Sequence, residues 1–533
     1  MIMPLIYTVF LVLLLSCISC RSKDSASTAN PTTDYLNQQF VIIFDNDDAS
    51  IKEVRSTFND IETISIGSKK IALINLNQRD QGFLNGHFEK SRFQLHSVRQ
   101  YEASEQIEDL NANELLPVSD KIAKEKAWTL SDGHGVVVAV ADDGIDYSHE
   151  DLRDSVWKNP GEIGQDENGY DKAANGLDDD SNGYVDDHMG WDFGRNDNDP
   201  RPEYFFHQHG TAVGGVISGQ SKRESGVTGV APGASIMPIK FRVGRRWTSL
   251  DILRGFKYAV DNGAKIINLS YDIDAYVGDE IFAEALSYVY RSGALIVNSA
   301  GNKGLKNPPR GVFDELLLVG STNNDSTSID ESSNFGDQID VLAPGFVRST
   351  VPNNSYKNFT GTSFSAAITS GTAALVWSKY PEYNREQVVA RIIGTTEILD
   401  ESDLISTNEF ETGVLNAYKA LVDLPRLSDL SFLSSETFNE GTLIKILIRG
   451  GLDPSSIVRS RFTLFDSSGQ SVGSVRLYRE NKVGSNTIDL FVESKLTSGQ
   501  YMLSIEGIVD AFGRPLLGSE PTALTKVVEF TLE

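Results

Sequence analysis

The chain has 533 residues, 40% hydrophobic and 23% charged, so it is long enough for several folded domains and too apolar to be disordered overall. Its 48 Lys and Arg against 74 Asp and Glu give a net charge of −26, which would repel phosphates and argues against binding nucleic acid. Its two cysteines, Cys17 and Cys20, exclude a disulfide framework, a Cys nucleophile and a Cys–zinc site from the rest of the chain.

The first residues predict a secretion signal of the lipoprotein type at 1–20. This segment has no charged side chain, and Leu5–Leu15 is an apolar run as long as a signal core but short for a membrane span. LLSC at 14–17 resembles a bacterial lipobox with Cys17 as the lipidated residue, and CRSKDS at 20–25 makes Cys20 a second candidate. We expect export across the inner membrane and a lipid anchor at the bacterial cell envelope, on the outer membrane or cell surface. An uncleaved anchor helix is the alternative.

A tether and a small module follow the signal. Residues 21–36 are rich in Ser, Thr, Asn and Pro and predict a flexible linker. Residues 37–104 predict a small α/β module, with strands at 40–44, 61–66 and 69–76 and a helix at 49–58. The acidic stretch at 102–117 lacks apolar periodicity, so we expect an exposed connection there.

Residues 105–423 predict an α/β domain. Short apolar strands are expected at 136–141, 235–241, 264–270, 294–300 and 316–321, with helices at 250–263, 279–293 and 416–425. Alternating strands and helices predict a mainly parallel sheet with helices on both faces. Residues 424–533 contain β-rich runs at 442–448, 461–466, 487–492, 501–507 and 526–532, which predict an antiparallel β-sandwich.

Three motifs in the α/β region carry candidate catalytic side chains. VAVADDGID at 138–146 places Asp142 at the end of a buried strand, where parallel sheets hold their sites. HGTAVGGVISG at 209–219 places His209 at the start of a helix of small residues. GTSFSAAITSGTAALV at 361–376 places Ser363 at a helix N-terminus, where the helix dipole favours developing negative charge. The chain order Asp, His, Ser is that of subtilisin among the known triads.

A fourth motif, ALIVNSAGNKG at 294–304, supplies an amide donor, Asn302, for a developing oxyanion. Together with NLS and DVLAPG, these motifs make residues 118–422 similar to the subtilisin family of serine proteases (subtilases, family S8). A catalytically silent binding or adhesion module with this fold is the alternative, but all four functional residues are present. An esterase is disfavoured because position 365 is Ser and the His precedes the nucleophile.

The resemblance implies a role for each residue. Ser363 would attack the peptide carbonyl, His209 would carry its proton, Asp142 would orient the His, and Asn302 would bind the oxyanion; no catalytic cofactor is implied. Ser270, Tyr271 and Asp272 match the segment that pairs with the substrate backbone. The chain departs from the family at Asp272, where Gly is usual, and at Ala367, where Pro is usual. We therefore expect Asp272 and Asp274 either to favour basic substrates or to be solvated loop acids.

The resemblance also implies roles for the flanking modules and the partners. Residues 37–104 look like a propeptide that is removed by self-processing, with an ordinary accessory domain as the alternative. Residues 496–516 resemble a hairpin of bacterial immunoglobulin-like modules. We expect a monomer that acts on proteins or peptides, binds no nucleic acid and contacts the membrane through its lipid.

An acidic loop predicts a structural calcium site. DDDSNGYVDD at 178–187 copies the first nine positions of an EF-hand loop, but Met189 stands where the bidentate Glu would be. The expected ligands are the side chains of Asp178, Asp180, Asn182 and Asp186, the carbonyl of Tyr184 and, to complete the shell, Asp187 or a distant residue. A solvated acidic loop without a metal is the alternative.

Overall fold

The computed structural model describes most of residues 121–532 and four shorter stretches before them. The described ranges are 39–45, 62–66, 69–75, 94–102, 121–204, 207–241, 246–336, 338–397, 412–423, 429–438, 441–449, 456–457, 460–478, 487–514, 516 and 525–532. The predicted signal with Cys17 and Cys20, the tether, the helix at 49–58 and most of the connection at 102–117 lie outside these ranges.

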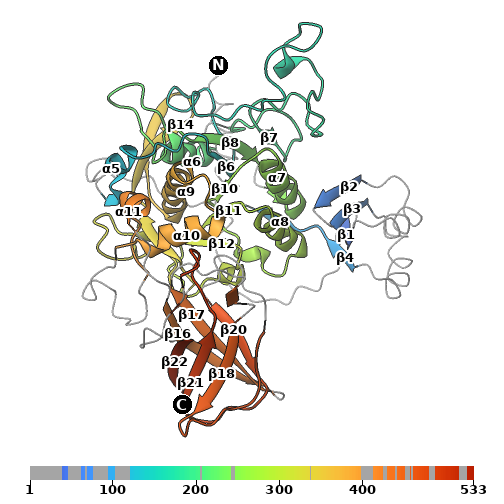
Figure 1. Cartoon of the computed structure of the whole chain (residues 1–533). Helices are drawn as coiled ribbons and strands as arrows, with labels where there is room; N and C mark the ends of the chain where they lie inside the picture. Colours follow the sequence, from blue (N-terminus) through green and yellow to red (C-terminus); the bar gives the residue numbers. More distant parts are fainter. Residues whose placement is uncertain are drawn as a thin grey trace, which may run out of the picture.

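A seven-stranded sheet forms the centre of the molecule (Figure 1). Its strands in spatial order are β13 (Val341–Pro344), β12 (Leu316–Thr322), β11 (Leu295–Ser299), β10 (Ile266–Leu269), β6 (Val137–Asp142), β8 (Ser235–Lys240) and β7 (Trp191–Asp192). Every neighbouring pair is parallel, as the alternation of strands and helices predicted. The carboxyl ends of β6, β10 and β11 therefore meet at one edge, where α/β sheets place their sites.

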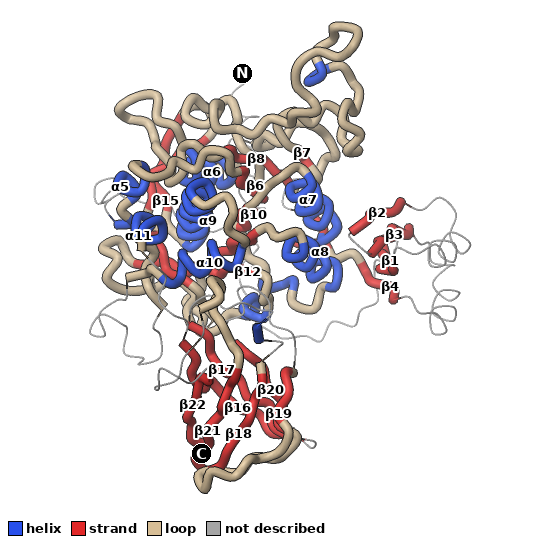
Figure 2. Tube along the Cα trace, in the orientation of Figure 1, coloured by secondary structure: helices blue, strands red, loops and turns tan. Residues whose placement is uncertain are grey.

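Helices cover both faces of this sheet, so the predicted fold class is confirmed (Figure 2). Side chains alternate between the faces along β6: Val138 and Val140 belong to the core with α6 and α9, and Ala139 and Ala141 to the core with α7 and α8. The helices are α5 (Lys124–Trp128), α6 (His209–Ser218), α7 (Ser249–Asp261), α8 (Glu280–Arg291), α9 (Thr362–Lys379), α10 (Arg385–Gly394) and α11 (Ala417–Val422). The small residues of α6 and α9 are almost all buried, because the two helices pack against each other at close range.

A β-hairpin, β14 (Val347–Val351) and β15 (Ser355–Phe359), packs on α6. Ser349 Oγ donates to the carbonyl O of Ala212 at 2.6 Å, and Thr350 Oγ1 donates to that of Thr211 at 2.8 Å. Gly215 faces this hairpin, since a Cβ there would lie 2.3 Å from Thr350 Oγ1. The hairpin therefore fixes the helix that begins with His209.

A separate antiparallel sheet lies beside α7 and α8 (Figure 1). Its strands in order are β2 (Glu62–Ile66), β3 (Lys69–Asn75), β1 (Gln39–Asp45) and β4 (Gln94–Ser97), of which β4 was not predicted. Lys69 Nζ contacts Glu284 of α8 at 3.0 Å, and Arg99 donates to the carbonyl O of Gly278 at 2.8 Å. The chain then continues into β5 (Gln100–Glu102), which pairs antiparallel with β9 (Arg246–Thr248) just before α7.

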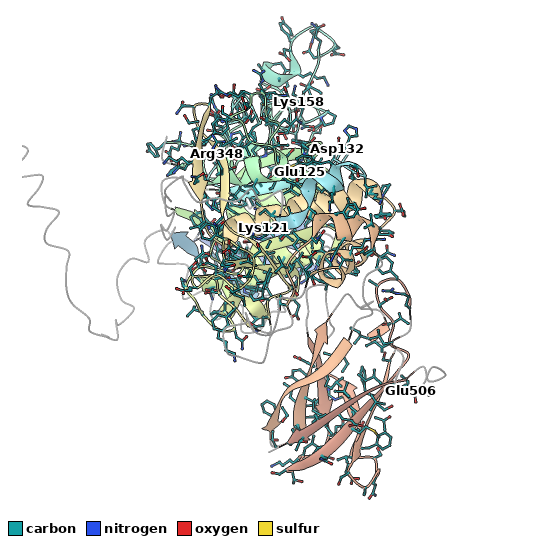
Figure 3. The ribbon with its side chains drawn as sticks, turned by 90° about the vertical axis from the view of Figure 1, so that its left-hand side faces the viewer. Lys121, Glu125, Asp132, Lys158, Arg348 and Glu506 are labelled. Carbon is teal, nitrogen blue, oxygen red and sulfur yellow. The ribbon has the colours of Figure 1, made fainter. Side chains whose placement is uncertain are left out.

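The C-terminal part forms two antiparallel sheets that pack face to face. One contains β16 (Asp429–Phe438), β17 (Gly441–Arg449), β20 (Thr487–Val492) and β19 (Val475–Leu477), and the other β18 (Arg461–Asp466), β21 (Gly499–Glu506) and β22 (Thr525–Leu532). The predicted sandwich is therefore present, with β16 and β19 as additional strands. Figure 3 shows it as a separate body, carrying Glu506, beyond the large unit that carries Lys158. Phe512 meets Tyr383 of the large unit edge to face, with ring centroids 5.6 Å apart.

Within the described ranges, no helix combines the length and the apolar character needed to cross a membrane.

Candidate active site

The end of β6 holds a carboxylate against an imidazole. Asp142 is the last residue of the strand, and its Oδ2 and Oδ1 lie 2.8 and 2.9 Å from His209 Nδ1. Oδ1 also accepts the backbone N–H of Asp143 at 2.8 Å, so the carboxylate has a fixed orientation. Because Asp142 is buried, the pair is little screened by solvent, and His209 Nδ1 is held towards the carboxylate.

A second carboxylate, Asp143, supports the helix of His209 from outside. Its Oδ1 accepts the N–H of Gly210 at 2.8 Å, and its Oδ2 accepts the N–H of His209 at 3.4 Å. The N-cap residue Gln208 provides no side-chain hydrogen bond to α6, so Asp143 satisfies these first-turn amides instead. Gly210 is required at this contact, since a Cβ would lie 2.5 Å from the carbonyl O of Gly144. No sequence motif indicated this role for Asp143, because the helix that it supports begins 66 residues later.

Ser363 lies in the first turn of α9. The preceding Gly361 has φ +130°, a conformation that favours glycine and turns the chain from β15 into the helix. Ser363 Oγ donates to the carbonyl O of Ser270 at 3.0 Å, and Ser270 Oγ donates to the carbonyl O of Ser363 at 2.9 Å. The phenyl ring of Phe364 is 5.7 Å from the imidazole of His209, which places the start of α9 beside the Asp142–His209 pair.

Asn302 follows β11 and lies against the same turn of α9. Its Oδ1 accepts the N–H of Thr362 at 2.9 Å and the hydroxyl of Thr362 at 2.8 Å. The same hydroxyl accepts the N–H of Gly301 at 3.1 Å. With Oδ1 held in this way, the Nδ2 group is the part of the amide that can donate to a group bound next to Ser363.

The substrate segment predicted at Ser270, Tyr271 and Asp272 follows β10, but its carboxylates are paired. Asp272 contacts Lys303 Nζ at 2.6 Å and also the buried guanidinium of Arg310, while Asp274 Oδ1 accepts from Arg310 Nε at 2.8 Å. Burial works to raise the pKa of Asp272, but Arg310 and Lys303 outweigh it and hold that pKa below its ordinary value.

Both carboxylates are therefore neutralised within the protein, and a preference for basic substrates stays a prediction. The two cations that neutralise them come from the loop after β11 and could not be read from the local sequence. Tyr271, in the segment after β10, has a buried hydroxyl, and burial raises its pKa well above the ordinary value.

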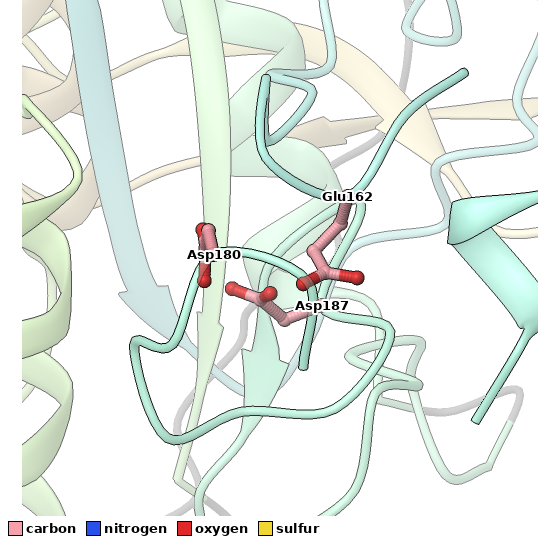
Figure 4. Close-up of side chains that lie close together, drawn as sticks. All are labelled: Glu162, Asp180 and Asp187. Atoms are coloured by element: carbon pink, nitrogen blue, oxygen red, sulfur yellow. The ribbon is translucent and has the colours of Figure 1, made fainter. Parts of the chain in front are cut away.

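An acidic cluster lies in the loop before β7. The carboxylates of Glu162, Asp180 and Asp187 approach one another so that one oxygen from each lies within 4.8 Å of the others (Figure 4). Glu162 and Asp187 are fully buried, and burial is the main cause that raises both of their pKa values. Glu162 Oε2 has no hydrogen-bond partner among the described residues. The cluster therefore joins two buried carboxylates, Glu162 and Asp187, to the exposed Asp180.

This grouping shares Asp180 and Asp187 with the EF-hand-like assignment, which as a whole stays a prediction. Asp178 accepts the N–H groups of Asn182 and Gly183 at 3.1 and 2.8 Å, and Asp186 accepts that of Gly176 at 3.0 Å, so both carboxylates serve the loop backbone. Asn182 directs its Nδ2 to Asp180 and Asp187 at 3.2 and 3.1 Å. Tyr184 packs its ring on Trp191, with centroids 5.0 Å apart. Glu162, sixteen residues before Asp178, was missed because it lies outside the acidic run.

Comparison with known proteins assigns the α/β region that carries these residues to a protein family. Residues 133–420 match the model of the subtilase family, Peptidase_S8. Thermitase from Thermoactinomyces vulgaris is 28% identical over 307 residues, which cover 56% of this chain and 94% of thermitase. The major intracellular serine protease of Bacillus subtilis (strain 168) is 30% identical over 58% of this chain and 91% of its own length. Subtilisin DY from Bacillus licheniformis is 33% identical over 36% of this chain and 72% of its own length.

Proposed function

Because the chain belongs to the subtilase family and is a subtilisin-like serine endopeptidase, we propose that it cleaves peptide bonds with Asp142, His209 and Ser363 as its triad. The observation that supports this assignment best is the contact of His209 Nδ1 with Asp142 at 2.8 Å, beside the N-terminal turn that presents Ser363. This arrangement leaves His209 Nε2 as the ring nitrogen that exchanges the proton of the nucleophile.

The chemistry follows from these positions. Ser363 Oγ donates to the carbonyl O of Ser270, so rotation of the side chain must first redirect it towards His209. It then attacks the substrate carbonyl, while His209 takes its proton and later passes it to the leaving amine; Asp142 stabilises the imidazolium. The negative oxygen of the tetrahedral intermediate accepts from Asn302 Nδ2 and from the N–H of Ser363 at the start of α9.

Two substitutions test this assignment. Ser363→Ala should remove peptidase activity and labelling by a fluorophosphonate, because the attacking oxygen is gone. Asn302→Ala should still be labelled but should lower kcat by about 10²–10³-fold, the usual effect of losing one oxyanion donor. Full labelling of Ser363→Ala would place the nucleophile elsewhere.

We infer that residues 37–104 form a propeptide. The small sheet contacts α8 through Lys69 and Glu284, and β5 adds to β9 as an extra antiparallel strand. Strand addition of this kind is how an extended peptide binds to an exposed strand, and the pairing of β5 with β9 supports the proposal for this reason. Cleavage after β5 would release the sheet and free β9 for a substrate.

We further propose that residues 424–533 form an immunoglobulin-like module. If the seven strands that the structure describes in this segment are lettered A to G in chain order, one sheet has the order A-B-E-D and the other C-F-G, which is the constant-type arrangement. Tyr501, near the start of the sixth strand, donates its hydroxyl to the carbonyl O of Thr497 at 2.9 Å, as a tyrosine corner does. Such a module would act as a spacer or an adhesive unit.

Calcium is the cation that we propose for the cluster of Glu162, Asp180 and Asp187. A set of carboxylate oxygens, one of them buried without a partner, fits a hard divalent cation. Bound calcium would supply positive charge that offsets the repulsion within the cluster. The role is structural, because Asp187 also accepts the hydroxyl of Tyr258 on α7 and so ties the loop to the sheet face.

We propose that the enzyme is a lipoprotein of the bacterial cell envelope, anchored through Cys17 or Cys20. This proposal rests on the lipobox-like sequence described above. The double variant Cys17→Ser, Cys20→Ser should lose its partitioning into the detergent phase, since the acyl chains supply the membrane affinity. Unchanged partitioning would instead support an uncleaved anchor helix.

A further inference from the structure

The loop that carries Asn302 is held by another asparagine, Asn334. Asn334 belongs to the loop that connects β12 to β13, and its side chain is fully buried. Its Nδ2 donates to Ala300 O at 2.8 Å, its Oδ1 accepts from Lys303 N at 3.1 Å and Leu305 N at 2.9 Å, and its own N–H donates to Gly301 O at 2.8 Å. The residues that form these bonds precede and follow Asn302 in the sequence. The hydrogen bonds of Asn334 therefore fix the backbone conformation of the whole turn.

The turn is also tightly packed against its supports. Gly301 has φ +101°, and a Cβ at this position would lie 2.5 Å from Asn334 Nδ2 and 3.1 Å from a terminal nitrogen of Arg310. Arg310 donates to the carbonyl O of Ser299 at 2.8 Å, at the end of β11. The buried side chains of Arg310 and Asn334 therefore hold the backbone of residues 299–305. They do so independently of the hydrogen bonds that Asn302 makes with its own partner.

The side chain of Asn302 is fixed separately, by Thr362. Its amide can point at the oxyanion only if the backbone of the turn and the start of α9 keep their mutual position. We propose that Asn334 is a positioning residue for the Asn302 amide and thereby for stabilisation of the transition state. This inference rests on the proposed role of Asn302 as an oxyanion donor.

A positioning role has a kinetic signature that a purely structural role lacks. A displaced oxyanion donor weakens binding of the transition state but not of the ground state, so kcat falls while KM changes little. In addition, the effect should disappear when the amide that is being positioned has already been removed. A general loss of stability would act equally in both backgrounds.

The experiment is a double-mutant cycle of Asn334→Ala and Asn302→Ala in the full chain. Cleavage of one peptide p-nitroanilide is measured, and active sites are counted with a fluorophosphonate so that folding and maturation do not enter kcat. We expect Asn334→Ala to lower kcat about tenfold with less than a twofold change in KM, and to lower it less than twofold further in the Asn302→Ala background.

Ser333→Ala is the matched control. Ser333 is the buried neighbour of Asn334 and also makes two hydrogen bonds, to Ser321 N and Asn334 O, but none to residues 299–305. It should leave kcat within twofold of wild type. If Asn334→Ala does not fold, Asn334→Ser carries the same cycle, because it removes the amide contacts to residues 300–305 without adding a buried charge.

The outcomes separate the inference from the function on which it rests. A tenfold loss in both backgrounds, or no loss from Asn334→Ala, would overturn the positioning role and leave Asn302 as assigned. An Asn302→Ala variant with wild-type kcat would overturn the oxyanion assignment itself, and the positioning role with it.

Discussion

Ser363 and Ser270 exchange hydrogen bonds in both directions. Each hydroxyl donates to the carbonyl oxygen of the other residue, at 3.0 Å from Ser363 and at 2.9 Å from Ser270. The exchange joins the first turn of α9 to the segment after β10. It is continued inward, because Asn268 Nδ2 donates to Ser270 Oγ at 2.8 Å and Asn268 Oδ1 accepts from Ser370 Oγ at 2.9 Å. The proposed nucleophile is therefore supported by a buried polar chain along α9.

Ser270→Ala should lower activity without preventing folding. The substitution removes the donor to the carbonyl O of Ser363 and leaves a buried group of Asn268 without its acceptor, each a cost of about 1–2 kcal/mol. We expect kcat/KM to fall about tenfold, measured per active site on one peptide p-nitroanilide. Ser292→Ala, at the exposed end of α8, is the control and should change nothing. Equal activity of the two variants would show that the exchange has no catalytic value.

Asp272→Asn tests whether the carboxylate of Asp272 selects basic substrates. Because Lys303 and Arg310 neutralise Asp272, the ratio of kcat/KM for basic over apolar residues at the cleaved bond should change less than about twofold. The melting temperature should fall by several degrees, since the buried Arg310 loses one of its carboxylate partners. A clear loss of preference for Lys or Arg would restore the original idea that Asp272 selects basic substrates.

The residues of the proposed triad could be picked out from the sequence because each lies at a point fixed by local structure. Asp142 ends a buried strand, His209 opens a helix, and Ser363 follows a glycine that only a sharp turn requires. The parallel sheet could be predicted for the same reason, since strands and helices alternate along the chain. The order of the motifs along the chain then indicated the subtilisin family, which no single motif could do.

The supporting residues could not be found in this way. Asn334 and Arg310 act on a turn that precedes them by many residues, and Asp143 caps a helix that begins 66 positions later. Glu162 joins two carboxylates of a loop that it does not belong to. These contacts arise only when separate loops meet above the sheet, and no local periodicity or spacing encodes them.

Maturation gives a test of the propeptide proposal. In Ser363→Ala the chain cannot cleave itself, so it should accumulate as a precursor about 10 kDa heavier than the mature wild-type chain. Glu284→Ala should weaken retention of the released sheet by removing its contact with Lys69, which is half exposed and therefore contributes only about 0.5 kcal/mol. Sizes on denaturing gels and N-terminal sequencing of the mature chain measure the outcome. Equal sizes for Ser363→Ala and wild type would argue for an accessory domain.

His149 should make the protein less stable in mild acid. Its ring is fully buried, with Nδ1 accepting the N–H of Asp151 at 3.1 Å and Nε2 at 3.2 Å from the carbonyl O of Ser355. Burial is the main cause that lowers the pKa of His149 below its ordinary value, so the folded state binds a proton less readily than the unfolded chain. Its contribution to stability is therefore present above about pH 6.5 and is lost as the pH falls towards the lowered pKa.

The measurement compares His149→Gln with the parent chain by urea unfolding between pH 8 and pH 5. Both chains carry Ser363→Ala, so that self-digestion does not interfere. Gln keeps a donor and an acceptor but does not titrate, and its free energy of unfolding should decline less over this range. Parallel curves for the two proteins would show that His149 contributes nothing to the pH dependence.

Calcium should stabilise the chain through Glu162, Asp180 and Asp187. In the Ser363→Ala background, removing calcium with a chelator should lower the melting temperature by about 5 °C or more, and calcium but not magnesium should restore it, because a ligand that binds only the folded state shifts the unfolding equilibrium. Asp187→Asn should abolish the calcium-dependent part of this shift. Asp178→Asn is the matched control: its carboxylate binds the amides of Asn182 and Gly183 and lies outside the cluster, so the shift should remain. Tyrosine and tryptophan fluorescence supplies a second readout, since Asp187 accepts the hydroxyl of Tyr258 and the ring of Tyr258 lies 5.0 Å from that of Tyr184.

If Asp178→Asn removes the shift in melting temperature and Asp187→Asn does not, the cation is bound by the EF-hand-like ligand set that the sequence first suggested. If chelation changes neither the melting temperature nor the fluorescence, the cluster binds no calcium.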